Sequence, residues 1–144
     1  MKPRVFLDTN ILISGIFFSG LESKLLSLGD LEFETAAICK EETLEVTKRK
    51  FKSFGVKNLE TALKEVENSF ADIKIIPKEE YENSIDDAKI LIPNKINDQK
   101  VLAAALASKP DYFVTGDEDF HTREIKSKVK VVKTKELLEE INRL

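Results

Sequence analysis

The sequence predicts a single α/β domain, residues 1–144, in which a mostly parallel sheet of four or five strands carries helices on both faces. Short apolar segments alternate with longer amphipathic segments along the whole chain. Its 144 residues suit one hydrophobic core, because domains usually contain about 100–200 residues. No repeat, low-complexity tract or linker divides the chain.

The chain opens with a predicted strand, a helix and a second strand. Residues 5–7 are apolar and stop at Asp8, which is typical of a buried strand that ends in a turn. Asn10 is placed to cap the following helix, whose apolar spacing continues to Gly29, where the chain can turn left-handed. Residues 33–38 predict the second strand.

Two helices and a strand follow. Residues 40–53 are rich in charge with spaced apolar side chains, and Gly55 closes the helix that they predict. Residues 58–71 carry one apolar helical stripe. The third strand, residues 73–76, ends at a proline.

The last third repeats the alternation. A helix is expected over residues 79–91 and another from about residue 97 to the break at Pro110. Strands are expected at residues 112–115 and 129–132, and Thr134 can cap a final helix that reaches residue 141.

Several classes of site are excluded by what the chain lacks. None of its five glycines forms the spacing that cradles phosphates in dinucleotide or P-loop sites. His121 is the sole histidine, which excludes an HExxH zinc site, and we expect it to be an exposed loop residue. Cys39 is the sole cysteine, which excludes an intrachain disulfide, and we expect it to fill space in the core.

No apolar run approaches the about 18–20 residues that cross a bilayer, so we expect no membrane segment. The use of a single cysteine fits a reducing interior. A cytoplasmic location is therefore expected.

Carboxylates occur where a parallel sheet gathers side chains. They are Asp8 after the first strand, Glu42 on the helix after the second, Asp98 at the start of a helix, and Asp117 and Asp119 after the fourth strand. In open α/β sheets, ligands bind beyond the carboxyl ends of the strands. Each acid has an ordinary explanation as a turn or helix-start residue, but together they predict one anionic pocket.

Such a pocket needs a counter-charge. Unit charges 4 Å apart repel by about 4 kcal/mol at an effective dielectric of 20. With no histidine or cysteine beside them, oxygen ligands favour Mg²⁺ or Mn²⁺ over zinc. Metal-assisted hydrolysis of a phosphodiester is the chemistry that this arrangement suits.

Three segments closely resemble the PIN-domain ribonucleases, many of which are toxins of type II toxin-antitoxin pairs. The segments are residues 5–14 (VFLDTNILIS), 97–105 (NDQKVLAAA) and 111–120 (DYFVTGDEDF). The resemblance implies a Rossmann-like sheet with strand order 3-2-1-4-5. It also implies Mg²⁺- or Mn²⁺-dependent cleavage of single-stranded RNA, an antitoxin protein as partner, and a homodimer.

The resemblance also assigns roles to individual residues. Asp8, Asp98 and Asp117 match the family's acidic, metal-binding positions, and Asp119 is an additional acid in the same loop. The family's glutamate corresponds to Glu41, Glu42 or Glu45, of which Glu42 best keeps the distance from the preceding strand. Thr9, Asn10 and Thr115 are candidates for orienting carboxylates or water.

An acidic chain, with a formal charge of −3, needs local positive charge to bind an anion. Lys48, Arg49, Lys50 and Lys52 form its densest basic cluster, which we expect to contact RNA phosphates. The ordinary alternative is a solvated helix end where cations favour the helix dipole.

Two other functions remain open at this point. The chain could be a degenerate PIN domain that binds RNA or acts as a scaffold. A haloacid dehalogenase-like phosphatase also starts from a strand-end aspartate, but it needs a second aspartate two positions after Asp8, where this chain has Asn10.

Overall fold

A computed structural model describes residues 1–144 and contains one five-stranded sheet in the order β3-β2-β1-β4-β5, with all neighbouring strands parallel. Both the α/β class and the strand order expected from the sequence are confirmed. The strands are β1 (Arg4–Leu7), β2 (Glu32–Ala36), β3 (Ile73–Ile76), β4 (Tyr112–Val114) and β5 (Val131–Val132).

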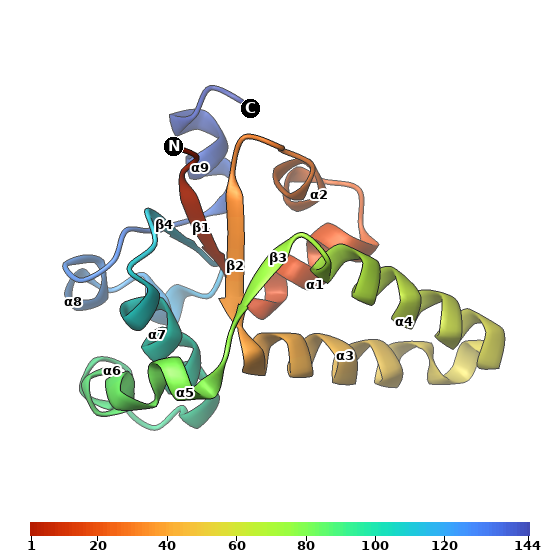
Figure 1. The fold of residues 1–144 in the computed structure, drawn as a ribbon, viewed down its shortest axis with the longest axis horizontal. Coiled ribbons are helices and arrows are strands. Elements are labelled where there is room, and N and C mark those ends of the chain that lie inside the picture. Colours follow the sequence, from red (N-terminus) through yellow and green to blue (C-terminus); the bar gives the residue numbers. More distant parts are fainter.

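Nine α-helices connect or follow the strands (Figure 1). They are α1 (Thr9–Phe17), α2 (Leu21–Leu26), α3 (Ala37–Phe51), α4 (Val56–Phe70), α5 (Lys78–Tyr81), α6 (Ile85–Leu91), α7 (Ile96–Ser108), α8 (Arg123–Lys126) and α9 (Thr134–Glu140). Short 3-10 helices cover Lys52–Phe54, Glu82–Ser84 and Glu118–Phe120. No helix is both long enough and apolar enough to traverse a bilayer.

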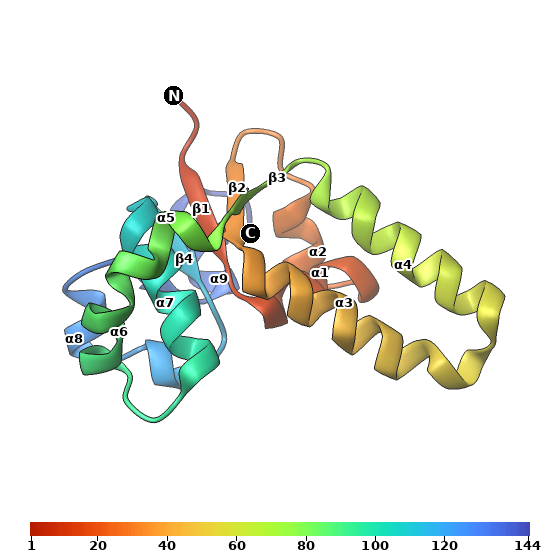
Figure 2. The ribbon, with the colours of Figure 1, turned by 60° about the horizontal axis from the view of Figure 1, so that its bottom comes forward.

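The helices form a layer on each face of the sheet. Helices α1, α2 and α9 lie on one face and α5 to α7 on the other, and α3 and α4 form an antiparallel pair that projects away from the sheet (Figures 1 and 2). The central strand β1 contributes three consecutive buried residues, since both of its faces are covered. Edge-to-face packing of Phe113 against Phe6 and Phe120 joins β1, β4 and the loop after β4.

The structure corrects the expected start of the first helix. The predicted helix to Gly29 is two helices, because Gly20 adopts an extended conformation between them. Asp8 rather than Asn10 is the cap residue, because α1 already begins at Thr9. Gly29 does not turn left-handed; the glycine that does is Gly55, with φ of 92°.

Later elements also differ from their expected bounds. Strand β2 ends at Ala36, so α3 begins earlier than expected, and the predicted helix over 79–91 is divided by a 3-10 turn. The last strand is shorter because the amide of Val129 donates to the carbonyl of Ile125 in the turn after α8. Thr134 lies inside α9, and Glu136 accepts from the amide of the cap residue Lys133 instead.

Strand order places a topological switch point between β1 and β4. The connections from these neighbouring strands run to opposite faces of the sheet, and ligands of open α/β sheets bind at such a point beyond the carboxyl ends. Asp8 follows β1 directly and Thr115 follows β4 directly. The fold therefore brings the two strand ends with the polar side chains together.

Candidate active site

Asp8 is a buried carboxylate, 7% exposed, at the carboxyl end of β1. Its Oδ1 accepts from the amide of Thr9 at 2.8 Å, and its Oδ2 accepts from the hydroxyl of Thr115 at 2.7 Å. Burial raises the pKa of Asp8, the two hydrogen bonds oppose that rise, and the charges of Asp98 and Asp117 add to it. The side chain is therefore held in one orientation and faces other acids.

Thr115 connects this carboxylate to the loop after β4. Its buried hydroxyl donates to Asp8 and accepts from the amide of Asp117 at 3.1 Å. The carboxylate of Asp117 in turn accepts from the amide of Asp119 at 2.9 Å. One hydroxyl thus fixes the loop that carries two further acids.

Three carboxylates form the tightest acidic group in the molecule. Oxygens of Asp98, Asp117 and Asp119 all lie within 4.8 Å of one another. Asp98 comes from the first turn of α7, whereas the other two follow β4. Burial raises the pKa of Asp98, the charge of Asp117 raises it further, and Lys95 opposes both effects.

Glu42 is the glutamate of α3 whose charge interacts with the other acids. It is half-buried, whereas Glu41 and Glu45 are exposed. Burial raises the pKa of Glu42, and the charges of Asp8 and Asp98 raise it further. Of the three glutamates considered, Glu42 is the one that is half-buried and whose pKa the charges of Asp8 and Asp98 raise.

Of the five acids expected from the sequence, the structure groups Asp98, Asp117 and Asp119, while the charges of this group raise the pKa values of Asp8 and Glu42. The resemblance implies a metal set of Asp8, Asp98 and Asp117, whereas the tightest group contains Asp119 in place of Asp8. Asp8 is outside this group, but the charges of Asp98 and Asp117 raise its pKa.

No soft ligand joins the carboxylates. Cys39 is buried as expected, and burial raises its pKa to about 12, so its thiol stays protonated. A donor set made only of carboxylate oxygens suits a hard divalent cation. Asp98, Asp117 and Asp119 therefore fit Mg²⁺ or Mn²⁺ by their chemistry and spacing.

The basic cluster lies at the far end of α3 and at the start of the 3-10 helix that follows it. Lys48, Arg49, Lys50 and Lys52 are all exposed, and none takes part in the ion pairs of the molecule. At about 1.5 Å per residue, Lys48 to Lys50 lie about 9–12 Å along the helix axis from Glu42. The structure does not bring these cations into the acidic site.

Two residues near the site were missed or misjudged from the sequence. His121 is partly buried rather than exposed, and its Nε2 lies 2.7 Å from the carbonyl oxygen of Thr115. Lys95, whose ammonium pairs with Asp119, was not identified. Its place three residues before Asp98, at the start of the helix that carries Asp98, was the available signal.

The family model described as "PIN domain" matches residues 6–142. Two solved structures have a similar fold. The crystal structure of VapBC2 from Rickettsia felis bound to a DNA fragment from its promoter is 17% identical, with a TM-score of 0.62, over 90% of this chain and 98% of that chain. The structure of VapBC-1 from nontypeable Haemophilus influenzae is 16% identical, with a TM-score of 0.67, over 92% and 98%. No curated protein matches this chain.

Proposed function

This chain belongs to the PIN-domain family, whose model matches nearly all of it, and from that premise we propose that it is a metal-dependent endoribonuclease acting on single-stranded RNA. The observation that carries the proposal is the three-carboxylate group of Asp98, Asp117 and Asp119 with Asp8 beside it. Hydrolysis of a phosphodiester forms a bond from water oxygen to phosphorus and breaks the bond to one ester oxygen. The water must lose a proton and the ester oxygen must gain one.

Asp98, Asp117 and Asp119 would hold Mg²⁺ or Mn²⁺, with Asp8 contributing from the strand end. When bound, such an ion supplies charge neutralisation at the phosphate and lowers the pKa of a water molecule. The protein's own part is to fix the carboxylates before the ion arrives. The hydroxyl of Thr115 does so by contacting both Asp8 and the amide of Asp117.

We assign the proton acceptor to Glu42. Asp8 has a donor on each oxygen, whereas no hydrogen bond engages the carboxylate of Glu42. Its raised pKa brings it closer to neutral pH, where a general base is most effective. The carboxylate of Glu42 would accept the proton of the attacking water.

The substrate contact is assigned to Lys48, Arg49, Lys50 and Lys52. These exposed cations form no ion pair within the protein, so RNA binding need not break one. Their distance from Glu42 along the helix suits a phosphate next to the scissile one rather than the scissile phosphate itself. Their charge offsets the repulsion between RNA and the acidic site.

We further propose that the chain is the toxin of a pair and that an antitoxin protein restrains it, since both similar structures are of VapBC proteins. An apolar groove of about 360 Å³ between α1 and α3 offers a surface for that partner. Its lining includes Phe17, Phe18, Phe51, Phe54 and Lys50. The adjacent basic cluster favours a partner segment that combines apolar and acidic side chains.

Co-expression with the product of the adjacent gene tests this partner. We expect the two proteins to co-purify and the partner to inhibit RNA cleavage. The double variant Phe18→Ser, Phe54→Ser should neither bind the partner nor be inhibited by it, because both residues are 61% exposed. Independent migration of the two proteins would contradict the proposal.

We also propose that the chain forms a homodimer and acts in the cytoplasm. A mass equal to that of a single chain in sedimentation equilibrium would refute the dimer.

The nuclease proposal is tested with labelled single-stranded RNA and DNA, in EDTA or with added Mn²⁺. We expect RNA cleavage only with metal, lost in Asp8→Asn and Asp98→Asn and retained in Asp72→Asn, an exposed acid that precedes β3 at the opposite edge of the sheet. Cleavage that survives in Asp98→Asn without metal would identify a contaminant. RNA binding without cleavage would favour the degenerate RNA-binding alternative, and a covalent phosphate on Asp8 would favour a phosphatase.

A further inference from the structure

Two lysines contact the acidic loop after β4 from different elements. Lys95, which precedes α7, pairs with Asp119, and Lys133, which precedes α9, pairs with Glu118 at 2.6 Å. Both lysine side chains are about half exposed. Only the first pair includes a member of the three-carboxylate group.

The backbone around Lys95 is fixed by the start of α7. Its carbonyl accepts from the amide of Gln99 at 2.9 Å, and the buried side-chain amide of Gln99 donates to the carbonyl of Ile92 at 3.1 Å. Asn94, which lies between Ile92 and Lys95 in the chain, has a left-handed φ of 71° that turns the chain into α7. Lys95 is therefore presented from an ordered turn.

The ammonium of Lys95 faces two of the three carboxylates. It pairs with Asp119, and its charge opposes the rise in the pKa of Asp98, which lies three residues later in the first turn of α7. Among the ion pairs of the molecule, only that of Lys95 contains one of these carboxylates. A divalent cation held by the same oxygens would repel it and compete for Asp119.

We propose that Lys95 is a positioning residue that serves as the built-in counter-ion of the metal-free site, neutralising Asp119 until a divalent cation displaces it. The inference rests on the proposed metal site. Lys95 thereby sets how tightly the site binds metal, and it does so through Asp119.

The experiment measures Mn²⁺ affinity of the metal-free protein by electron paramagnetic resonance of the unbound ion. We expect Lys95→Met to bind Mn²⁺ about three- to fivefold more tightly, in line with the loss of one competing exposed ion pair. Lys133→Met, which breaks the neighbouring pair in the same loop, should leave the affinity unchanged. In an Asp119→Asn background, the gain from Lys95→Met should be smaller, because the ion pair with Asp119 is already absent.

Three results would overturn the role of Lys95. They are an unchanged or weaker affinity in Lys95→Met, an equal gain in Lys133→Met, and a gain of the same size in the Asp119→Asn background. Wild-type protein that binds no Mn²⁺ would remove the metal site of the proposed function, and the inference with it. If the wild-type protein binds Mn²⁺ and Lys95→Met binds it with the same affinity, the inference about Lys95 fails while the proposed metal site stands.

Discussion

The hydroxyl of Thr115 donates to Oδ2 of Asp8 at 2.7 Å, joining two buried residues that lie 107 positions apart in the chain. The contact joins the carboxyl ends of the neighbouring parallel strands β1 and β4. Because the same hydroxyl accepts from the amide of Asp117, it couples the strand-end carboxylate to the acidic loop. The geometry of the site therefore depends on this one side chain.

Thr115→Val keeps the shape of the side chain but removes both hydrogen bonds. We expect a decrease of about 1–3 kcal/mol in the free energy of unfolding, because the buried carboxylate of Asp8 loses one of its two donors and the amide of Asp117 loses its acceptor. The pKa of Asp8 should rise further, so the acidic limb of the pH-rate profile should move to higher pH. Thr115→Ser should restore both properties, and an unshifted profile in the valine variant would contradict the coupling.

Glu42→Gln should lower kcat for RNA cleavage by about a hundredfold or more, the low end of what a general base contributes. Glu41→Gln and Glu45→Gln are matched controls, since these neighbouring glutamates are exposed and should keep activity near the wild-type level. Single-turnover cleavage rates compare the three. A larger loss in either control would assign the role to that residue.

Asp98→Asn should stabilise the metal-free protein at neutral pH. Burial first, and Asp117 second, raise the pKa of Asp98 above 3.8, so its ionised form opposes folding. The stability of the wild-type protein should therefore fall as pH rises through the interval above 3.8, whereas below it the carboxyl is protonated in both states. We expect a gain on the order of 1 kcal/mol at pH 7, the repulsion of unit charges about 4 Å apart in water.

Urea unfolding in EDTA measures this gain, which should vanish near pH 4. Saturating Mn²⁺ should reverse the order of stability, because only the wild-type protein keeps all three carboxylates. A gain that is equal at both pH values would show that ionisation of Asp98 is not its cause.

Reversing the charges of the basic cluster should weaken RNA binding and flatten its salt dependence. Because four side chains would no longer neutralise phosphates, the slope of log K against log salt should decrease in magnitude by about 2.8 for a single strand. Measurements use the four-fold glutamate variant of Lys48, Arg49, Lys50 and Lys52, made in an Asp98→Asn background to prevent cleavage.

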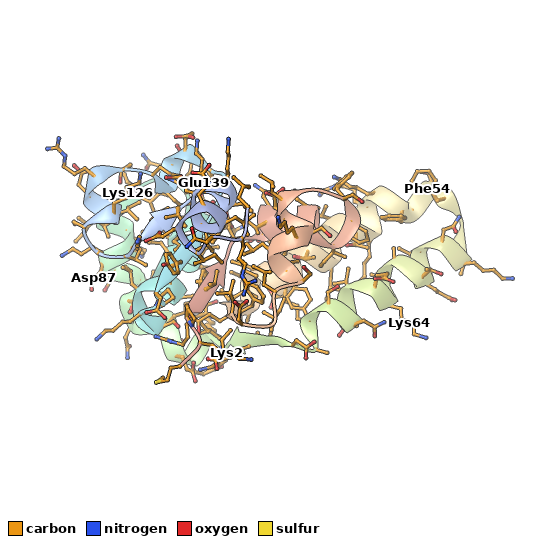
Figure 3. All side chains as sticks on the ribbon, turned by 90° about the horizontal axis from the view of Figure 1, so that it is seen from above. Lys2, Phe54, Lys64, Asp87, Lys126 and Glu139 are labelled. Atoms are coloured by element: carbon orange, nitrogen blue, oxygen red, sulfur yellow. The ribbon has the colours of Figure 1, made fainter.

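The charge-matched control reverses four exposed cations elsewhere: Arg123, Lys126, Lys128 and Lys135. Lys126 lies at the opposite end of the molecule from Phe54, which marks the tip of the α3–α4 pair next to the basic cluster (Figure 3). An equal change of slope in both variants would mean that net charge, rather than the α3 cluster, governs binding.

Arg4→Met should destabilise the fold and leave the catalytic site intact. The guanidinium of Arg4 lies 3.4 Å from the carboxylate of Glu34, whose side chain is 3% exposed, and donates to Ser108 at 3.2 Å. Its removal leaves a buried carboxylate with one neutral partner, at a cost of about 2–4 kcal/mol. Thermal unfolding measures the destabilisation, and kcat below the unfolding range should stay at the wild-type value.

Much of the fold follows from local patterns in the sequence. Apolar runs of strand length alternate with helical stripes, and the breaks at proline and glycine separate them, so the class and most elements were predicted correctly. Boundaries such as the one at Thr9 were misplaced, because a cap at Asp8 and a cap at Asn10 both satisfy the same local preference. Tertiary contacts decide between them.

The sequence by itself determined that the acids would gather, because carboxylates that follow parallel strands share one edge of the sheet. It did not determine which glutamate faces them, that Asp119 rather than Asp8 completes the tightest group, or that Lys95 reaches that group. The physical reason is the separation along the chain over which each effect acts. Periodicity and capping act over a few residues, whereas the contact of Thr115 with Asp8, or of Lys95 with Asp119, exists only after distant segments have packed.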